Sequence, residues 1–490
     1  MDEQVLAAPA AAPARRTALD GVEAGGEGGK GFGREGRTSS KPPDGITSRA
    51  LYSDIITIAW PSVVELFLTQ LTSMVDLMMV GQLGPWAITA VGLTTQPKFL
   101  MAITFMSLNV GATAMVARYR GAGQPEKANL ILRQALLLTF IVGAVSSAVG
   151  YWYSRELILF MGAKDALSLE AGTAYFQVQM AGFLTVALAS TMTATLRGVG
   201  DSKTAMRYNI VANVVNVIFN YLLIYGHFGF PCLGVTGAAV ATVMGQTVSF
   251  FMALRAVTCG RKYLHLRFRD GFRPHGEALR SIFHIGFPAM LENIVMRAGM
   301  IVFSKMVADL GTVPFATHQV CISIQAMSFM NGQALAVSST SLVGQSLGKR
   351  RPDMAQAYGC HAARVGCCTA VVLMAVFVFL GRPIAALYTN DEAVVLQSAR
   401  ILRFVALVQI PQAIQFIYAG ALRGAGDTRS VAVVMFITTL LLRPALGWLF
   451  IYQLALGLDG AWIGVVIDQL IRSILIQMRY RSGGWKRLNI

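Results

Sequence analysis

The chain has 490 residues, of which 54% are hydrophobic and only 13% are charged. Soluble globular proteins carry about 25% charged residues, so this composition excludes a soluble enzyme and favours a membrane protein. The formal net charge of +16 would suit a nucleic-acid binder, but the basic residues are spread over connections between apolar segments rather than gathered in one patch.

Residues 1–46 differ from the rest of the chain. They are rich in Ala, Gly and Pro and contain no long apolar stretch. This composition is typical of a disordered segment and argues against a signal peptide within it. We therefore predict a disordered cytoplasmic N-terminal tail.

After the tail, apolar segments recur to the end of the chain. A transmembrane helix needs about 20 apolar residues, and backbone groups in lipid must be bonded internally, so these segments predict helices. The predicted spans of the first half are 54–80, 88–118, 130–152, 171–196, 204–226 and 234–258. Those of the second half are 281–308, 314–345, 359–384, 393–421, 430–454 and 458–480. The predicted fold class is an all-α integral membrane protein with twelve transmembrane helices.

The two halves repeat one another at a distance of 226 or 227 residues. Residues 60–65 (WPSVVE) return as 287–292 (FPAMLE), and residues 196–201 (LRGVGD) return as 422–427 (LRGAGD). Six spans in each half give both halves the same orientation, so we expect two six-helix lobes related by a pseudo-twofold axis along the membrane normal. The predicted lobes are 47–258 and 281–490, the second ending in a short cytoplasmic tail.

Residues 259–280 are predicted to be a basic linker between the lobes, and the other connections on that side are basic as well. On the opposite side, the connections 81–87, 227–233 and 455–459 contain no Lys or Arg. Because basic loops face the cytoplasm, we expect both termini and the linker there. This distribution also argues against nucleic acid as a partner.

Polar side chains follow one face of two predicted helices in the first lobe. Both sets have the offsets 0, 4, 7 and 11, which place their members along one helix face. Polar groups in a bilayer are costly, so the sets are expected to face a cavity, although packing between helices remains an alternative. We call these two sets the polar stripes: Glu65, Thr69, Thr72 and Asp76 in the first helix, and Asn209, Asn213, Asn216 and Asn220 in the fifth.

The second half keeps the scaffold but not these polar residues. Phe303 stands opposite Asp76, and Leu446 stands opposite Asn220. We infer that a coupling cation, H⁺ or Na⁺, binds in the first lobe, with Asp76 as the charged group that is protonated or that ligates the sodium ion. The expected members of this cation-coupling site are Asp76, Asn213, Asn216 and Asn220.

Other polar residues in the predicted spans are candidates for a substrate cavity: Glu65, Thr72, Glu292, Arg297 and Gln412. Glu292 and Arg297 are five residues apart and so are not stacked on one helix face. A structural ion pair for Glu292, with Arg297 across the bundle, and a role in substrate binding both remain open.

The repeated Arg-Gly-x-Gly-Asp sequence predicts a tight cytoplasmic turn that its Arg and Asp tie together. It is not a phosphate-binding loop, because no strand precedes it and no Gly-Lys-Ser/Thr follows. We expect neither an enzyme nor a cofactor other than the coupling ion.

Taken together, these segments resemble the multidrug and toxic compound extrusion (MATE) family, closer to its NorM-like and DinF-like bacterial members. The likeness rests on residues 61–84, 196–201, 216–220, 234–239, 342–348, 422–427 and 443–444. It implies a twelve-helix, two-lobed antiporter that exports organic, mostly cationic and amphipathic compounds in exchange for protons or sodium. It also implies a cation site at Asp76, Asn216 and Asn220, joined by Thr242.

The chain departs from NorM-like members where they carry acidic residues in the second lobe, because Met296 and Gln412 stand there. This departure weakens a second-lobe sodium site and favours proton coupling at Asp76. The leading prediction is therefore an alternating-access exporter of small organic molecules, monomeric in the lipid bilayer. The resemblance to bacterial members implies that this bilayer is the bacterial inner membrane.

Two other functions fit the sequence less well. A lipid-linked saccharide flippase would need a cationic cavity to hold phosphates, whereas the predicted cavity stripes are acidic and rich in amides. A non-transporting membrane scaffold or receptor would not depend on the charge of Asp76.

Overall fold

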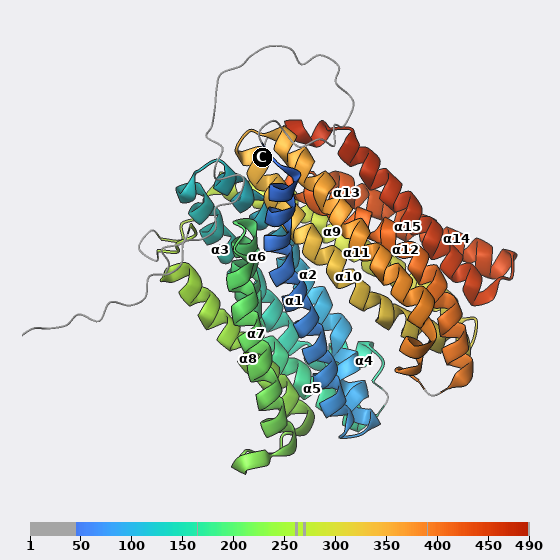
Figure 1. The fold of residues 1–490 in the computed structure, drawn as a ribbon. Coiled ribbons are helices and arrows are strands. Elements are labelled where there is room, and N and C mark those ends of the chain that lie inside the picture. Colours follow the sequence, from blue (N-terminus) through green and yellow to red (C-terminus); the bar gives the residue numbers. More distant parts are fainter. Residues whose placement is uncertain (1–45, 164, 260–262, 268–270, 390, 489–490) are drawn as a thin grey trace, which may run out of the picture.

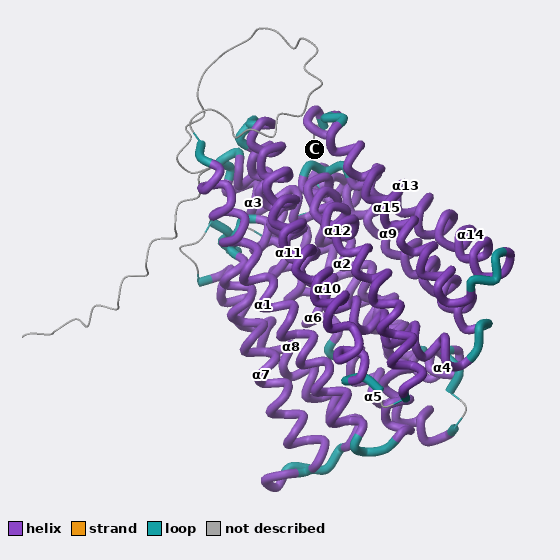
Figure 2. The backbone as a smooth tube through the Cα atoms, turned by 45° about the vertical axis from the view of Figure 1, so that its right-hand side comes forward, coloured by secondary structure: helices purple, strands orange, loops and turns teal. Residues whose placement is uncertain are grey.

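The computed structural model describes residues 46–163, 165–259, 263–267, 271–389 and 391–488. The predicted tail up to residue 45 and parts of the predicted linker lie outside the described residues. Helices make up almost all of the described chain, and the loops lie at the two ends of the bundle (Figure 2). The predicted fold class is confirmed: the described residues include 11 helices long and apolar enough to cross a membrane, or 12 if one bent pair counts as one span.

The helices of the first half follow the predicted order, with one short addition, α4 (Ser154–Phe160). They are α1 (Ser48–Gly81), α2 (Pro85–Gly121), α3 (Pro125–Trp152), α5 (Ala166–Ala181), α6 (Phe183–Gly198), α7 (Ser202–Tyr225) and α8 (Gly234–Thr258). The second half contains α9 (Gly276–Ala308), α10 (Thr312–Gly348), α11 (Pro352–Ala386), α12 (Glu392–Gly424), α13 (Thr428–Met435), α14 (Arg443–Trp448) and α15 (Gly457–Arg481). Helix α9 thus begins inside the segment predicted as linker.

Local sequence explains where several helices begin and end. The repeat-related α3 and α11 both start at a proline, Pro125 and Pro352, where the missing N–H would have no helical partner in any case. The Asp201 carboxylate accepts a hydrogen bond from the Thr204 backbone N–H at 3.2 Å and caps α7. The same helix ends at Gly226, whose φ of 73° is left-handed.

Two predicted spans are not single regular helices. The span 171–196 is divided into α5 and α6, which meet at an angle of 49°. The bend lies at Gly182, where a Cβ atom would come within 2.4 Å of Val243 Cγ1, so α8 packs directly against it. The span 430–454 includes π-helical turns at Phe436–Leu442 and Leu449–Gln453. Pro444 follows the first π turn and lacks the N–H that a regular helix would use there.

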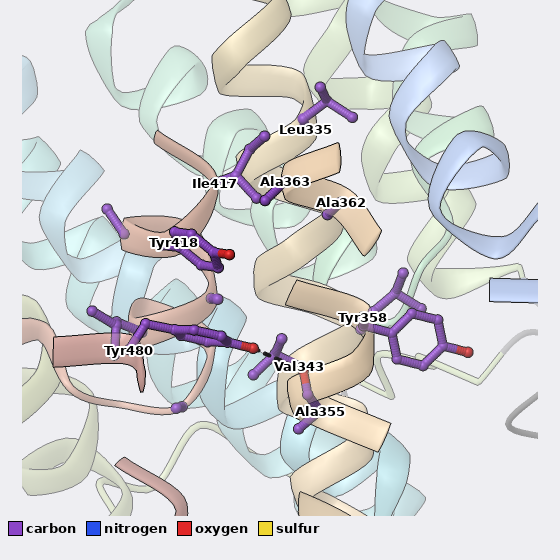
Figure 3. Packing of buried hydrophobic residues seen from close by; sticks show 14 of the residues in the cluster. Leu335, Val343, Ala355, Tyr358, Ala362, Ala363, Ile417, Tyr418 and Tyr480 are labelled. Atoms are coloured by element: carbon purple, nitrogen blue, oxygen red, sulfur yellow. Dashed lines mark hydrogen bonds between the residues drawn. The ribbon is translucent and has the colours of Figure 1, made fainter. Parts of the chain in front are cut away.

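The two halves form two groups of helices, blue to green and yellow to red in Figure 1. The groups lie close together at the end of the bundle that holds the C-terminus and diverge toward the opposite end. At the close end, the first turns of α1 belong to a hydrophobic core of the second half. Leu51 and Ile55 join a buried cluster with Val343, Tyr358 and Tyr418. Figure 3 shows the last three of these residues.

The exchange is reciprocal. Ala278 and Ile282 at the start of α9 lie in the core cluster of the first half, and they are the repeat equivalents of Leu51 and Ile55. Burial of apolar side chains in the other half stabilises the interface between the lobes. Each lobe therefore begins with a helix segment that is anchored in its neighbour.

The backbones of the two lobes come close together at a glycine contact between α2 and α10. A Cβ atom at Gly121 would lie 1.9 Å from the Gln345 carbonyl oxygen, and one at Gly348 would lie 1.9 Å from the Arg118 carbonyl oxygen. The two contacts are related by the repeat. Close by, Ser341 Oγ donates to the Gly198 carbonyl oxygen across the lobes at 2.9 Å.

We expect the substitution Gly121→Ala to separate α2 from α10 at this end, because the added methyl group has no space beside the Gln345 backbone. The measurement is maleimide labelling of a cysteine placed at Ser341, in a variant without the native cysteines, which should become faster. Gly92→Ala is the matched control, since this glycine also lies on α2 but has no atom within 4 Å of the added methyl group. Equal labelling in both variants would contradict the role of the contact.

Candidate functional site

Each half contains a buried ion pair made by repeated residues. Arg197 Nη2 donates to Glu65 Oε1 at 2.6 Å in the first half, and Arg423 pairs with Glu292 in the second. The exposed fractions of the two glutamates are 5% and 4%. A carboxylate at such a position needs a compensating charge, which the arginine supplies. The sequence left open whether Glu292 forms a structural ion pair. It does form one, but its partner is Arg423 and not Arg297.

The same arginines correct the expectation for the two glycine turns. Each turn is tied to a preceding helix, α1 or α9, through the bond of its arginine to the glutamate. The aspartates serve the segments that follow: Asp201 caps α7, and Asp427 accepts a hydrogen bond from Arg479 Nε at 2.7 Å. The turns therefore connect helices of their own lobe rather than closing mainly on themselves.

The two polar stripes of the first lobe face each other along α1 and α7. Asn209 Nδ2 donates to Glu65 Oε1 at 2.5 Å, and Asn213 Nδ2 donates to Thr69 Oγ1 at 3.3 Å. Farther along the same two helices, the Asn220 amide donates to Asp76. Each pair joins residues 144 positions apart, so the two helices keep one register over the whole length of the stripes.

Asp76 is the centre of a polar cluster contributed by three helices. With its amide nitrogen toward the carboxylate, Asn216 donates to Asp76 Oδ1 at 2.9 Å, and its amide oxygen lies 3.2 Å from Thr242 Oγ1 on α8. The amide oxygen of Asn220 is buried and has no hydrogen-bond partner in the described structure. The structure thus brings together four of the five residues expected to bind the coupling cation.

The other residues predicted on these stripes lie outside that cluster. Asn213 bonds to Thr69 rather than to Asp76, and Thr72 Oγ1 donates to the Leu68 carbonyl oxygen of its own helix at 2.9 Å. Both side chains therefore serve contacts between or within helices.

Two residues near Asp76 were not among those predicted from the sequence for the cation-coupling site. The ammonium group of Lys98 on α2 and the phenol of Tyr175 on α5 both lie within electrostatic range of the Asp76 carboxylate. Lys98 could have been found, because it is the only lysine of the predicted span 88–118. Tyr175 gave no such signal, since a tyrosine in an apolar span is common.

A cavity of about 770 Å³ lies between the two lobes. Both halves line it, the first through α1, α2 and α6 and the second through α9, α10, α12, α13, the π turn Phe436–Leu442, α14 and α15. Of the residues predicted for a substrate cavity, Glu292 and Arg297 are part of this lining. Glu65, Thr72 and Gln412 are not: Glu65 lies behind Arg197, and Gln412 faces a separate small void between α10, α11 and α12.

In the second lobe, an acidic residue outside the predicted sites, Asp468, lies beside this cavity. Asp468 on α15 is fully buried and accepts from Arg443 Nε at 2.8 Å and from Arg472 Nη2 at 2.7 Å and 2.6 Å. Its signal was available, because Asp468 and Arg472 are spaced i, i+4 inside the predicted span 458–480. Phe303, the repeat equivalent of Asp76 in the second half, is buried beside His318.

No group of three or more His, Cys, Asp or Glu side chains that could hold a metal ion occurs among the residues that the structure describes. The Asp76 cluster offers oxygen atoms from one carboxylate, the two amides of Asn216 and Asn220, and the hydroxyl of Thr242. Hard cations such as Na⁺ bind oxygen ligands, and a carboxylate binds a proton directly.

Comparison with known proteins gives a consistent result. The MatE family model matches residues 61–222 and 288–449, two segments that begin 227 residues apart. A probable multidrug resistance protein NorM of Thermotoga maritima is 28% identical over 438 residues, which cover 89% of this chain and 93% of the relative. The multidrug resistance protein PmpM of Pseudomonas aeruginosa is 29% identical over 450 residues, covering 89% and 92%.

Solved structures share the fold. A MOP superfamily transporter from Pyrococcus furiosus, reported for the reverse polarity of its binding pocket, has a TM-score of 0.84 at 23% identity, covering 91% of this chain and all of that one. A multidrug resistance MATE family transporter of the MOP superfamily in an outward-facing conformation has a TM-score of 0.83 at 23% identity, covering 91% and 99%. At these identities the likeness shows the fold alone.

Proposed function

Since this chain belongs to the MATE family of multidrug efflux transporters, we propose that it exports small organic compounds in exchange for an inward-moving cation. The observation that carries the proposal is the Asp76 cluster. A carboxylate held by two buried amides inside an apolar bundle is costly, and a site that binds and releases a cation explains its presence.

In this mechanism the cation binds to Asp76 and changes how α1 and α7 pack. The two helices are joined along their whole stripes, so a change in charge at Asp76 alters a contact that both share. The cavity between the lobes would hold the substrate, and rocking of the lobes would expose it to each side in turn.

We propose that the cation is a proton. Asn216 and Asn220 direct amide N–H groups at the Asp76 carboxylate, which leaves few oxygen atoms facing a sodium ion. The second lobe adds no acid at the positions of Met296 and Gln412. The proposal further includes a monomer in the bacterial inner membrane with both termini in the cytoplasm, as the basic connections suggest.

The decisive experiment measures transport by the full chain in proteoliposomes under a pH gradient and, separately, under a sodium gradient. Two dyes with the same xanthene core, cationic rhodamine 6G and anionic carboxyfluorescein, serve as candidate substrates. We expect uptake or release that depends on the pH gradient and stops when an ionophore collapses it. Sodium-dependent transport alone would reject the proton, and no gradient-dependent transport of either dye would reject the exporter.

One observation favours the flippase as a second candidate. The lining of the cavity between the lobes includes five arginines and none of the residues of the two polar stripes, so the reason for ranking a flippase low has weakened. Photo-crosslinking of a polyprenyl lipid to the cavity would support the flippase.

A further inference from the structure

The cavity between the lobes carries more positive than negative charge. Its charged lining contains a single acid, Glu292, and five arginines: Arg197, Arg297, Arg423, Arg443 and Arg472. Both halves contribute to this set, so it is a property of the assembled interface rather than of one helix.

Three buried carboxylates compensate part of this charge. Glu65 and Glu292 each pair with one arginine, and Asp468 pairs with two, Arg443 and Arg472. Five guanidinium groups therefore face three carboxylates. Two positive charges at the cavity are left without a compensating acid among the residues that the structure describes.

Arg297 is the clearest of the uncompensated groups. No carboxylate of the described chain pairs with it, and its guanidinium carbon lies 3.6 Å from the centre of the Phe99 ring. Stacking on an aromatic ring holds the planar guanidinium in place and leaves its N–H edge available for a carboxylate or phosphate. The side chain is partly exposed and belongs to the cavity lining.

Several buried polar groups of the lining also lack partners. Both ring nitrogens of His318, whose exposed fraction is 1%, have no hydrogen bond in the described structure, and neither has the hydroxyl oxygen of Thr439. Buried polar groups are nearly always bonded, so unpartnered ones at a cavity are available to bond to a ligand or to water. An imidazole N–H and a hydroxyl both donate hydrogen bonds, which suits an acceptor-rich ligand.

The rest of the lining is largely apolar and aromatic. It includes Met106, Met296, Met300, Phe329, Phe416 and Trp462. A volume of about 770 Å³ is within the range of sites that enclose drug-sized molecules. The ligand therefore needs an apolar or aromatic body as well as a charged group.

We propose that this cavity binds amphipathic organic anions, with a carboxylate or phosphate group at Arg297 and an aromatic body against the methionine and phenylalanine side chains. The inference rests on the proposed exporter function and names its substrate class. It replaces the expectation of mostly cationic substrates. A cation in the same place would meet two uncompensated positive charges in a medium of low dielectric constant, where like charges repel strongly.

The test is equilibrium binding of the two xanthene dyes to the purified full chain, measured by fluorescence anisotropy. We expect carboxyfluorescein to bind at least about tenfold more tightly than rhodamine 6G, because a charge-assisted hydrogen bond changes affinity by this amount or more. Tighter binding of rhodamine 6G would overturn the proposal.

Variants of Arg297 locate the site. Arg297→Gln should weaken carboxyfluorescein binding about tenfold and leave rhodamine 6G binding unchanged or stronger. Arg400→Gln is the control, since Arg400 is 68% exposed and lies outside the cavity lining. Thermal unfolding of each variant checks that it is folded. Equal dye binding in Arg297→Gln and the wild type would overturn the assignment.

Two further arms separate related outcomes. Unlabelled 2-naphthoate and a polyprenyl pyrophosphate compete for the dye in parallel; displacement by naphthoate supports the proposal, and displacement by the lipid alone overturns it. Transport data distinguish this inference from the proposed function. Gradient-driven export of rhodamine 6G without carboxyfluorescein binding rejects only the anion site, whereas carboxyfluorescein binding without any gradient-driven transport rejects only the exporter.

Discussion

Proteoliposomes that contain Asp76→Asn are expected to show no gradient-driven dye transport above that of empty vesicles. The substitution removes the only carboxylate of the first-lobe cluster, while the asparagine side chain keeps nearly the same shape. Asn216 and Asn220 lose the charge that their amide groups bond, so no cation binds and the α1–α7 contact no longer responds to the gradient. The measurement is the initial rate of transport under a pH gradient.

Dye binding is the second readout for this variant. The cavity is separate from the Asp76 cluster, so Asp76→Asn should still bind carboxyfluorescein with nearly the wild-type affinity. Asp309→Asn is the matched control, because this aspartate is exposed at the end of α9 and accepts a hydrogen bond from the exposed Tyr452 hydroxyl. Full transport by Asp76→Asn, in correctly inserted protein, would refute the role of Asp76.

Asp468→Asn is expected to destabilise the protein more than any other single change considered. Asp468 holds Arg443 and Arg472 deep in the second lobe, and its exposed fraction is 0%. Removal of one partner from a buried ion pair costs about 3–5 kcal/mol because the remaining charge is left uncompensated. Here two arginines would lose their acid, so the purified variant should unfold at a clearly lower temperature or fail to accumulate in the membrane.

Asp459→Asn is a control on the same helix. Its carboxylate pairs with Arg400, whose side chain is 68% exposed, and exposed pairs contribute about 0–1 kcal/mol. The triple variant Arg443→Met, Asp468→Leu, Arg472→Met removes all three charges together and should recover much of the lost stability. Unchanged thermal unfolding of Asp468→Asn would show that the triad is not needed for the fold.

Much of the scaffold could be predicted from residue spacing. The lengths of the apolar segments predicted the membrane spans. Pro61 and Pro288 are 227 residues apart, and the two segments that match the family model begin at the same separation. The offsets of the stripes placed Asp76 and Asn220 on matching faces, which α1 and α7 indeed turn toward each other. These are properties of a regular helix, so they follow from the order of residues.

The features that residue spacing could not predict depend on partners that lie far apart in the chain. Glu292 bonds to Arg423, 131 residues away, and not to Arg297, five residues away. The bend at Gly182 depends on Val243 of another helix, and the glycine contact at Gly121 depends on Gln345 of the other lobe. Helical periodicity fixes the face on which a residue lies but not the neighbour that the face meets.

The sequence by itself determined that the chain is a duplicated bundle of membrane helices whose first half holds the polar stripes. Lipid excludes unpaired backbone groups, long apolar runs satisfy them as helices, and burial cost restricts where charges occur, so both conclusions follow from composition and periodicity. Only the tertiary structure decided which charges cancel. Glu65, Glu292 and Asp468 pair with four arginines, Asp468 being shared by two, and Arg297 has no acid among the described residues. The two positive charges left over, which no spacing reveals, give the central cavity its sign.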